Sequence, residues 1–179
     1  MRNEYDFFWA FPEARFAIAK TLFLYHTESP DLENFIDETI YYFEKNAVEN
    51  HDKSIFISYY SNALNLIEKY DLAHSLQTKY IDLQFLSSEN YYHSYSQLPI
   101  YTICNATTLY NVGEIQKAKE IYDELKKQNL ENLPFDIKEY VQIQFYLLGY
   151  YLNKKDRLHL NKIDEIITKT NFQFYKKFL

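Results

Sequence analysis

Glycine and proline are scarce in this sequence, which has two glycines and four prolines among its 179 residues. Turn-rich β-sheet folds consume glycine at their turns, so the scarcity argues against them. It favours long helices that are joined by short connections. A chain of this length has room for a substantial core, and we expect one domain spanning residues 1–179.

Cysteine and long apolar runs are also lacking. The single cysteine, Cys104, excludes an internal disulfide bond and fits a reducing compartment. Glu4 and Asp6 stand where a secretory signal would be basic and then apolar. The longest apolar stretch, residues 16–25, contains Lys20 and is too short to span a bilayer. We therefore expect a soluble cytoplasmic protein that does not contact a membrane.

Basic residues are in the minority, and the charge is unevenly distributed. The net charge is −6 over residues 1–60, −4 over residues 61–152 and +4 over residues 153–179. The overall acidity argues against nucleic acid as the main partner, because that binding depends on neutralising phosphates. The basic C-terminal segment is typical of a last helix whose lysines complement its negative end, and a basic patch is the alternative.

Aromatic residues, by contrast, are abundant, with 19 tyrosines and 14 phenylalanines. A binding surface is one explanation, because tyrosine offers contact area and a hydroxyl group at low entropic cost. Base composition is the other, since abundant Tyr, Phe, Asn, Ile and Lys with scarce Gly is typical of an AT-rich genome. We assign the total to base composition and keep the binding interpretation for particular positions.

Apolar residues recur at helical spacing along nearly the whole chain, as in the stripe that begins with Ile137, Val141 and Phe145. Proline and capping residues divide this pattern into segments, and Pro12 and Pro30 fit the first turn of a helix. The predicted helices span residues 12–26, 30–48, 52–69, 71–86, 94–111, 114–128, 134–153 and 156–176. Because every connection is short, neighbouring helices should form antiparallel hairpins.

Small residues recur at a fixed spacing, since Ala63, Ala106 and Gly149 are each 43 residues apart. Three further sets share this period: Leu66, Leu109 and Leu152; Leu72, Ile115 and Leu158; and Ser75, Ala118 and Asn161. We expect the small residue to let the second helix of each hairpin approach the first. The apolar pairs around each turn should close the hairpin. Internal repetition at this period indicates stacked supersecondary units.

The stretch that contains Ala106, Leu109, Gly113, Ala118 and Tyr122 resembles the tetratricopeptide repeat. That family has a small residue and an aromatic residue or leucine in its first helix, a glycine at the turn, and an alanine followed by an aromatic residue in its second helix. The resemblance is complete over residues 98–128, partial over 145–165 and degenerate over 55–80, and the period is longer than the usual 34 residues. We expect Gly113 to leave the first helix with positive φ.

This resemblance implies an all-α fold. We expect a right-handed array of about four antiparallel helical hairpins, with about eight helices. A divergent N-terminal hairpin would cover residues 1–50, and repeat units would cover residues 51–90, 94–133 and 134–179.

In tetratricopeptide-like arrays the first helix of each hairpin lines the inner, concave wall. Carrying those positions over gives eight candidate ligand-binding residues: Tyr60, Glu68, Thr107, Tyr110, Asn111, Tyr146, Tyr150 and Asn153. The same positions include Leu64, Ile67, Ile103 and Lys154. Tyrosine and asparagine can stack on side chains and hydrogen-bond a peptide backbone, and packing between hairpins is the alternative. Ile103 and Thr107 stand where a basic carboxylate clamp would need lysine and asparagine, which argues against chaperone tails as ligands.

Enzymatic interpretations find little support, and we expect no cofactor and no bound metal. His51 and Asp52 are similar to the histidine–aspartate pair of helical phosphohydrolases, but they fit the start of a helix better. Tyr122 and Lys126 have the spacing of a reductase pair without the glycine-rich turn that such an enzyme needs. Cys104 fits a buried structural thiol.

The sequence therefore favours a non-enzymatic module that binds a peptide or a protein segment, as a regulatory sensor or scaffold. Its long hairpins resemble the ligand-sensing domains of bacterial peptide-pheromone regulators of the Rgg and PlcR type. Those proteins begin with a helix-turn-helix, whereas residues 1–60 here are acidic, so the resemblance implies a sensor without its DNA reader, or a fragment. The alternative is a helical enzyme, such as a metal-dependent phosphohydrolase, whose site is assembled only in three dimensions. A homodimer stays open, with Trp9 as an end cap or a dimer contact.

Overall fold

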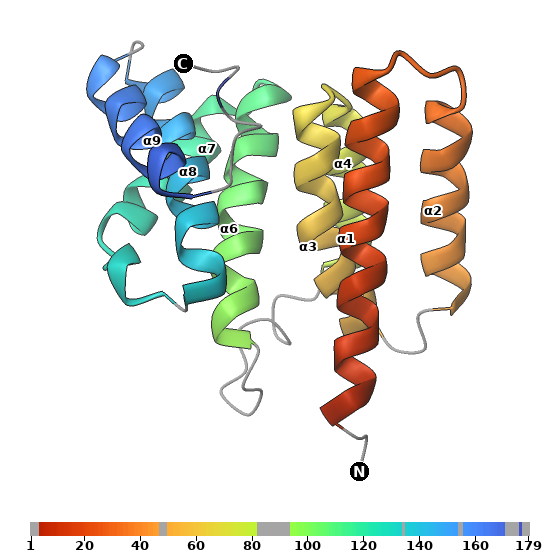
Figure 1. The fold of residues 1–179 in the computed structure, drawn as a ribbon. Helices are drawn as coiled ribbons and strands as arrows, with labels where there is room; N and C mark the ends of the chain where they lie inside the picture. Colours follow the sequence, from red (N-terminus) through yellow and green to blue (C-terminus); the bar gives the residue numbers. More distant parts are fainter. Residues whose placement is uncertain are drawn as a thin grey trace. The chain divides into compact units, whose positions relative to one another are not determined.

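The computed structural model describes residues 4–46, 50–81, 94–133, 135–153, 156–170 and 176. At residues 4–14, 50–52, 55, 94–97 and 135–137 it describes the backbone alone. Within this part of the chain every regular element is helical, which confirms the predicted all-α class (Figure 1). The handedness of the array stays a prediction.

The chain divides into two compact units, residues 1–97 (unit 1) and 98–179 (unit 2). Unit 1 contains α1 (Glu4–His26), α2 (Leu32–Asn46), α3 (Asn50–Leu66) and α4 (Tyr70–Tyr80). Most of α6 (Ser94–Asn111) belongs to unit 2, with α7 (Ile115–Lys126), the 3-10 helix η1 (Leu130–Asn132), α8 (Phe135–Leu152) and α9 (Arg157–Lys169). The predicted single domain stays a prediction. No helix among the described residues combines the length and apolarity that crossing a membrane requires.

All eight predicted helical segments contain a helix, and the deviations are at their ends. The largest is in α1, which begins at Glu4, so the prediction that Pro12 opens the helix was wrong. A proline inside a helix removes one backbone hydrogen bond, and the helical residues on both sides can continue past it with a kink. Helix α4 ends at Tyr80 and α9 at Lys169, earlier than the predicted ends at residues 86 and 176.

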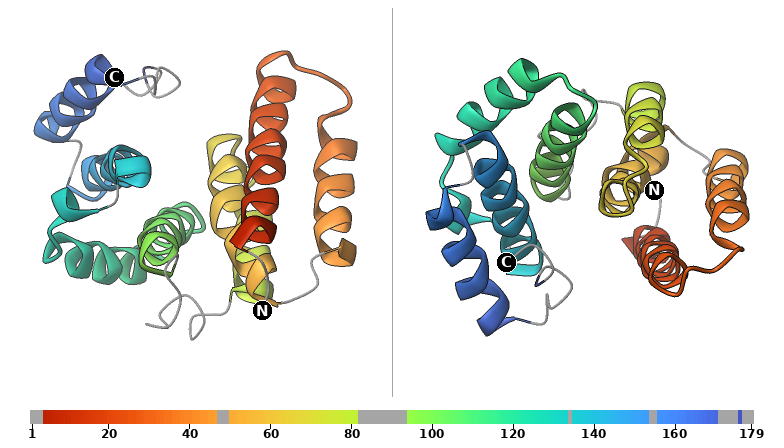
Figure 2. Two further views of the ribbon diagram at one scale, coloured as in Figure 1. Left: turned by 60° about the horizontal axis from the view of Figure 1, so that its bottom comes forward. Right: turned by 90° about the horizontal axis from the view of Figure 1, so that it is seen from above.

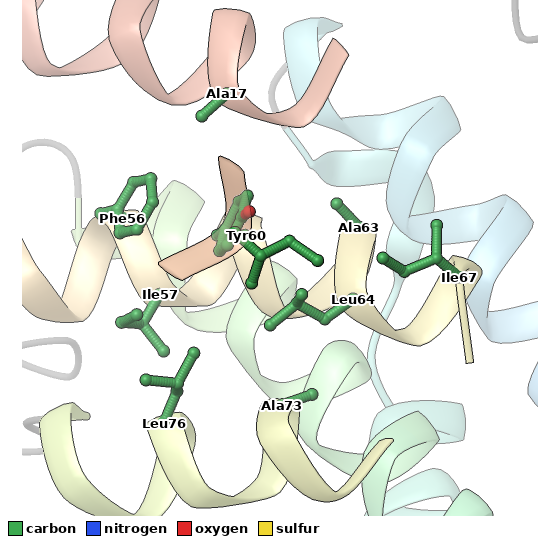
Figure 3. Close-up of a cluster of buried hydrophobic side chains, with 10 residues drawn as sticks. Ala17, Phe56, Ile57, Tyr60, Ala63, Leu64, Ile67, Ala73 and Leu76 are labelled. Atoms are coloured by element: carbon green, nitrogen blue, oxygen red, sulfur yellow. The ribbon is translucent and has the colours of Figure 1, made fainter. Parts of the chain in front are cut away.

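In unit 1, α3 is the central helix, because it contacts α1, α2 and α4. Its buried side chains include Phe56, Tyr60 and Leu64, which form one apolar cluster with residues of the neighbouring helices (Figure 3). Each such side chain contributes about 1.5–3 kcal/mol through burial. The hydroxyl group of Tyr60 is satisfied inside this core, since Tyr60 Oη lies 3.0 Å from Thr21 Oγ1 on α1.

In unit 2, α8 contacts α7, α9 and η1, and two views show the hairpin of α8 and α9 (Figure 2). The residues that α9 buries are Ile163 and Ile167, one helical turn apart. Helix α7 buries Ala118, Tyr122 and Leu125 at the same kind of spacing. Helices α7 and α9 therefore each present a narrow apolar stripe to their neighbours, as the periodicity of the sequence predicts.

The first helix of each of the first three hairpins ends in the same left-handed turn. The residues with positive φ are Glu28 (50°), Glu68 (66°) and Gly113 (88°), and the last confirms the prediction for this glycine. Each turn has the two hydrogen bonds of a Schellman cap: Glu28 N to Tyr25 O and Ser29 N to Leu24 O; Glu68 N to Asn65 O and Lys69 N to Leu64 O; Gly113 N to Tyr110 O and Glu114 N to Leu109 O.

These caps correct the predicted 43-residue period. Gly113 follows Glu68 by 45 residues, and Glu68 follows Glu28 by 40. In the 45-residue register Ala73 and Ala118 become equivalent, and both are fully buried, whereas Ser75 is exposed. A slip of two residues turns a side chain by about 200° around its helix, so the 43-residue register compares opposite faces.

The predicted closure of the hairpins by apolar pairs holds in part for Leu72, which packs against the core of unit 1, but was wrong for the other two pairs. Ile115 is 52 % exposed and Leu158 is 62 % exposed, because each lies at the start of a second helix on its solvent face. The small residues Ala63, Ala106 and Gly149 are all buried, but Ala63 lies five residues before its cap and Ala106 seven residues before. They do not occupy equivalent places.

The lack of a side chain at position 149 has a specific steric reason. A Cβ atom at this position in α8 would lie 2.5 Å from Tyr122 Oη and 2.6 Å from the ring of His159. Two side chains from α7 and α9 therefore occupy the space that a side chain of residue 149 would need. The prediction of a small residue at a helix crossing holds for this position.

We expect Gly113→Ala to lower the free energy of unfolding by about 1 kcal/mol, because alanine is strained at positive φ. We expect Glu68→Gly to raise it by about 0.5–1 kcal/mol, because Glu68 is an exposed non-glycine residue in the same conformation. Urea denaturation followed by circular dichroism measures both. Equal signs for the two variants would contradict the assignment of one shared turn.

We expect Gly149→Ala to destabilise the protein by about 1–3 kcal/mol through overpacking, despite the better helix propensity of alanine. Adding Tyr122→Phe removes the closest atom, so the double variant should lose less than the sum of the two single variants. Thermal melting of all four proteins measures this coupling. Strict additivity would show that Tyr122 moves aside without cost.

Candidate functional site

The predicted ligand-binding residues of unit 1 do not form a surface. Tyr60 is fully buried in the core and hydrogen-bonded to Thr21, so its assignment to a ligand-binding wall was wrong. Leu64 and Ile67 are buried beside it. Glu68 is exposed, in the turn between α3 and α4, where its backbone closes the cap.

Correcting the register does not give unit 1 a ligand-binding surface. With the caps aligned, the equivalents of Thr107 and Tyr110 are Asn62 and Asn65, which are buried polar residues of α3. Asn62 Oδ1 is buried without a hydrogen-bond partner among the described residues. The 43-residue period had instead selected the apolar face that α3 turns towards α1.

The predicted residues of unit 2 lie where a ligand can reach them. Thr107, Tyr110 and Asn111 are half-buried near the end of α6. Tyr146 and Tyr150 are half-buried on α8, and Asn153 is exposed just after it. Two further predicted positions of this wall have other outcomes: Ile103 is fully buried, and Lys154 lies outside the described residues.

Ring contacts connect the two helices of this surface. The rings of Tyr110 on α6 and Tyr151 on α8 stack with centroids 5.8 Å apart, and Tyr150 meets Tyr151 edge-on at 5.4 Å. We call Tyr110, Tyr150 and Tyr151 the tyrosine platform. Edge-to-face and offset contacts of this kind stabilise an aromatic cluster by about 0.5–1.5 kcal/mol per pair. The platform therefore holds α6 and α8 together and leaves ring area in solvent.

The hydroxyl groups of the tyrosine platform remain available to a ligand. Within the described part of the chain, no hydrogen bond engages the hydroxyl group of Tyr110, Tyr150 or Tyr151. Partial burial, with the neighbouring Tyr150 and Tyr110, raises the pKa of Tyr151. A tyrosine hydroxyl group can both donate and accept hydrogen bonds.

A second group of rings joins α8 to α7 and α9. Phe145 stacks on Tyr122 of α7 at 4.6 Å, and Tyr146 meets Phe145 at 5.6 Å. His159 of α9 faces Tyr146 at 6.3 Å. These contacts join α7, α8 and α9, so Tyr146 has a packing role in addition to its predicted place on the ligand-binding wall.

Tyr122, His159 and Asp156 form a hydroxyl–imidazole–carboxylate series. Tyr122 Oη lies 3.2 Å from His159 Nε2, and His159 Nδ1 lies 3.8 Å from Asp156 Oδ2. Burial raises the pKa of Tyr122, against a hydrogen bond from Asn153. A nucleophile or base would need a lowered pKa and an accessible oxygen. Tyr122 is buried, and Asp156 already caps α9 through Leu158 N, so this series is structural.

Asn153 serves the fold as well. Its Nδ2 donates to Gly149 O over 2.8 Å, and the side chain also hydrogen-bonds to Tyr122. Gly149 O also accepts the backbone N–H of Asn153 over 2.9 Å, so the amide group adds a second hydrogen bond to this carbonyl near the end of α8. Of the predicted wall, Tyr110 contacts a neighbouring helix through Tyr151, whereas the Thr107 hydroxyl group donates within its own helix, to Ile103 O.

Unit 1 has a small hollow of about 230 Å³ that is open to solvent. It is lined by apolar side chains and by Glu44, Lys53 and Tyr80. Glu44 accepts hydrogen bonds from Tyr80 and from Lys79, the latter over 3.1 Å. The hydrogen bond from Tyr80, followed by that from Lys79, lowers the pKa of Glu44. Much of this volume is open solvent, and the enclosed space of about 10 Å³ has room for at most one water molecule.

We expect Tyr80→Phe to raise the pKa of Glu44 towards the ordinary value of a glutamate, because the largest lowering cause is removed. Lys79→Met should also raise it, because a hydrogen bond and a nearby positive charge are removed. Carbon-detected NMR titration of the Glu44 carboxyl group measures both, with Tyr41→Phe as the control on the same helix. An unchanged pKa in Tyr80→Phe would contradict the hydrogen bond.

Metal ligands do not gather in the part of the chain that the structure describes, where no group of three His, Cys, Asp or Glu side chains is placed to hold an ion. The side chains of His51 and Asp52 lie outside the described residues. Cys104 is fully buried beside Tyr140, and burial raises the pKa of its thiol to about 12. A thiol in this state is unreactive, as the sequence predicts.

Two contributing residues were missed at the sequence level. Tyr151 completes the tyrosine platform, and its signal was its place beside Tyr150 on a helix whose other face is buried. His159 joins α9 to α7 and α8, and the sequence gives no sign of it, because its partner Tyr122 lies 37 residues earlier. The side chain of Trp9 lies outside the described residues.

The comparisons with known proteins give no identification. No protein-family model matches the chain, and neither a curated protein nor a solved structure matches it.

Proposed function

We propose that the chain is a non-enzymatic binding module, a helical-hairpin array of tetratricopeptide type that takes a peptide or a protein segment. The observation that carries this proposal is the tyrosine platform on α6 and α8, with its exposed ring area and unengaged hydroxyl groups. Thr107 and Asn111 flank it with polar groups. A regulatory or scaffolding role in the cytoplasm belongs to the same proposal.

The chemistry of the platform suits an extended peptide. Tyrosine rings bind apolar side chains and peptide planes, and their hydroxyl groups bond backbone carbonyl and amide groups without selecting a charge. A carboxylate clamp would need basic side chains among these positions, and Thr107, Tyr110 and Asn111 supply none. The expected ligand is therefore an internal, neutral or weakly basic segment rather than a free C-terminus.

The spacing of residues in two hairpins supports the tetratricopeptide assignment. Ser61, Leu64 and Ala73 have the same spacing around the cap at Glu68 as Ala106, Leu109 and Ala118 have around Gly113. Both hairpins bury the small residues and the alanine. A sensor domain of the peptide-pheromone type, without a DNA reader, is a narrower form of the same proposal.

The test is selection of peptides from a random phage-displayed library, followed by titration of the enriched peptide in fluorescence anisotropy. We expect Tyr110→Ala and Tyr146→Ala each to weaken the dissociation constant by roughly tenfold, about 1.4 kcal/mol. Tyr41→Ala, an exposed tyrosine of α2, is the matched control and should leave binding unchanged.

Two results would overturn the proposal. Loss of thermal stability by more than about 2 kcal/mol in both variants would show that Tyr110 and Tyr146 are packing residues. Stoichiometric zinc, iron or manganese in the purified protein would favour the alternative, a helical enzyme such as a metal-dependent phosphohydrolase. A peptide that co-purifies and is identified by mass spectrometry would support binding directly.

A further inference from the structure

An exposed aromatic face lies along α1 and α2. Phe16 and Phe23 are each 64 % exposed and lie seven residues apart, on one side of α1. Phe35 and Tyr42 have the same spacing on α2, where Tyr42 is 46 % exposed. We call these four side chains the aromatic face of hairpin 1.

Contacts of Lys20 show that the rings on α1 and the rings on α2 lie next to each other. Its Nζ lies 4.2 Å from the ring centroid of Phe35 on α2 and 5.9 Å from that of Phe16 on α1. One ammonium group therefore reaches rings on both helices, with an attraction of about 0.5–1 kcal/mol at such exposed sites. The aromatic side chains form a single two-helix surface.

A surface of this kind is unusual on the end of a helical array. Terminal hairpins of such arrays normally have polar outer faces, and monomers rarely expose large contiguous apolar patches. At roughly 150–250 Å² per aromatic side chain, the exposed parts of Phe16, Phe23 and Tyr42 amount to about 300–400 Å². A weak specific interface buries roughly 1,000 Å² in total. The exposed aromatic area of two copies, together with the aliphatic parts of the neighbouring side chains, reaches this value.

We propose that hairpin 1 docks on hairpin 1 of a second copy through the aromatic face, as a two-fold symmetric dimer. The charges on the face favour a second copy. Lys20 lies at its centre, and Glu38 is exposed between Phe35 and Tyr42 on the same side of α2. Across a two-fold axis Lys20 of each copy pairs with Glu38 of the other, so one ion pair occurs twice.

A lipid surface fits this face less well. Anionic headgroups would attract Lys20 but repel Glu38 and the further acidic residues of α2, Glu33 and Asp37. The proposed dimer is independent of the proposed peptide binding, because every residue it uses lies in α1 and α2.

The test is light scattering coupled to size-exclusion chromatography, from about 5 to 500 µM protein near 0.15 M salt, where surface charges are screened beyond about 8 Å. We expect the mass to rise from 21.7 kDa towards twice that value with concentration. The double substitution Phe16→Ser with Phe23→Ser should raise the dimer dissociation constant at least tenfold. Tyr41→Ser, an exposed aromatic residue outside the face, is the matched control and should not change it.

A charge exchange identifies the partner as a second copy. Lys20→Glu and Glu38→Lys should each weaken the dimer about tenfold, and the two together should restore it to within about threefold of the wild type. Circular dichroism melting at 5 µM should show that all variants fold. A monomer at every concentration, a dimer that the serine variants leave intact, or an exchange without rescue would overturn the proposal. Binding of a monomer to phosphatidylcholine–phosphatidylserine vesicles through Phe16 and Phe23 would overturn it as well.

Discussion

The left-handed residues at the ends of α3 and α6 determine how the hairpins α3–α4 and α6–α7 pack. Each cap reverses the chain in a fixed geometry, so residues at the same distance beyond these two caps face back towards the first helix. Ala73 and Ala118 both lie five residues after their caps, and both are fully buried. Glu28, Glu68 and Gly113 adopt this conformation with the same two hydrogen bonds. The caps, rather than the small residues of the first helices, therefore define equivalence between α3–α4 and α6–α7, whereas in α1–α2 the residue at the same distance, Glu33, is exposed.

Helices were predictable from the sequence because their periodicity is a local property, and all eight predicted segments contain one. Alignment of the hairpins was not predictable. Glycine at position 113 predicts a left-handed turn from the sequence. The equivalent turns at Glu28 and Glu68 have glutamate at this position, and glutamate does not predict such a turn. The recurrence of Ala63, Ala106 and Gly149 at 43 residues was a coincidence of common residue types, while the caps are 40 and 45 residues apart.

The predicted site residues also differ between the two units: those of unit 2 are accessible, whereas Tyr60 of unit 1 is buried. In unit 2, Thr107 and Tyr110 were counted from Ala106, and Tyr150 was reached through the same 43-residue spacing as Tyr60; all three are half-buried and accessible. Tyr60 was reached by transferring the positions through the wrong period, which exchanged a polar face of α3 for the core. The contact of Tyr110 with Tyr151 depends on how α6 packs against α8. The local sequence of one helix does not determine this packing, so the contact could not be predicted.

Gly149 also constrains how this sequence can change over generations. Its missing side chain is matched to Tyr122 and His159, which come from two other helices and fill the space. A lineage in which glycine 149 is first replaced carries a crowded, weakened intermediate, whereas one that first shortens Tyr122 or His159 opens the way to larger residues. The order of substitutions at these three sites is therefore restricted, and descendants should retain or lose the trio together.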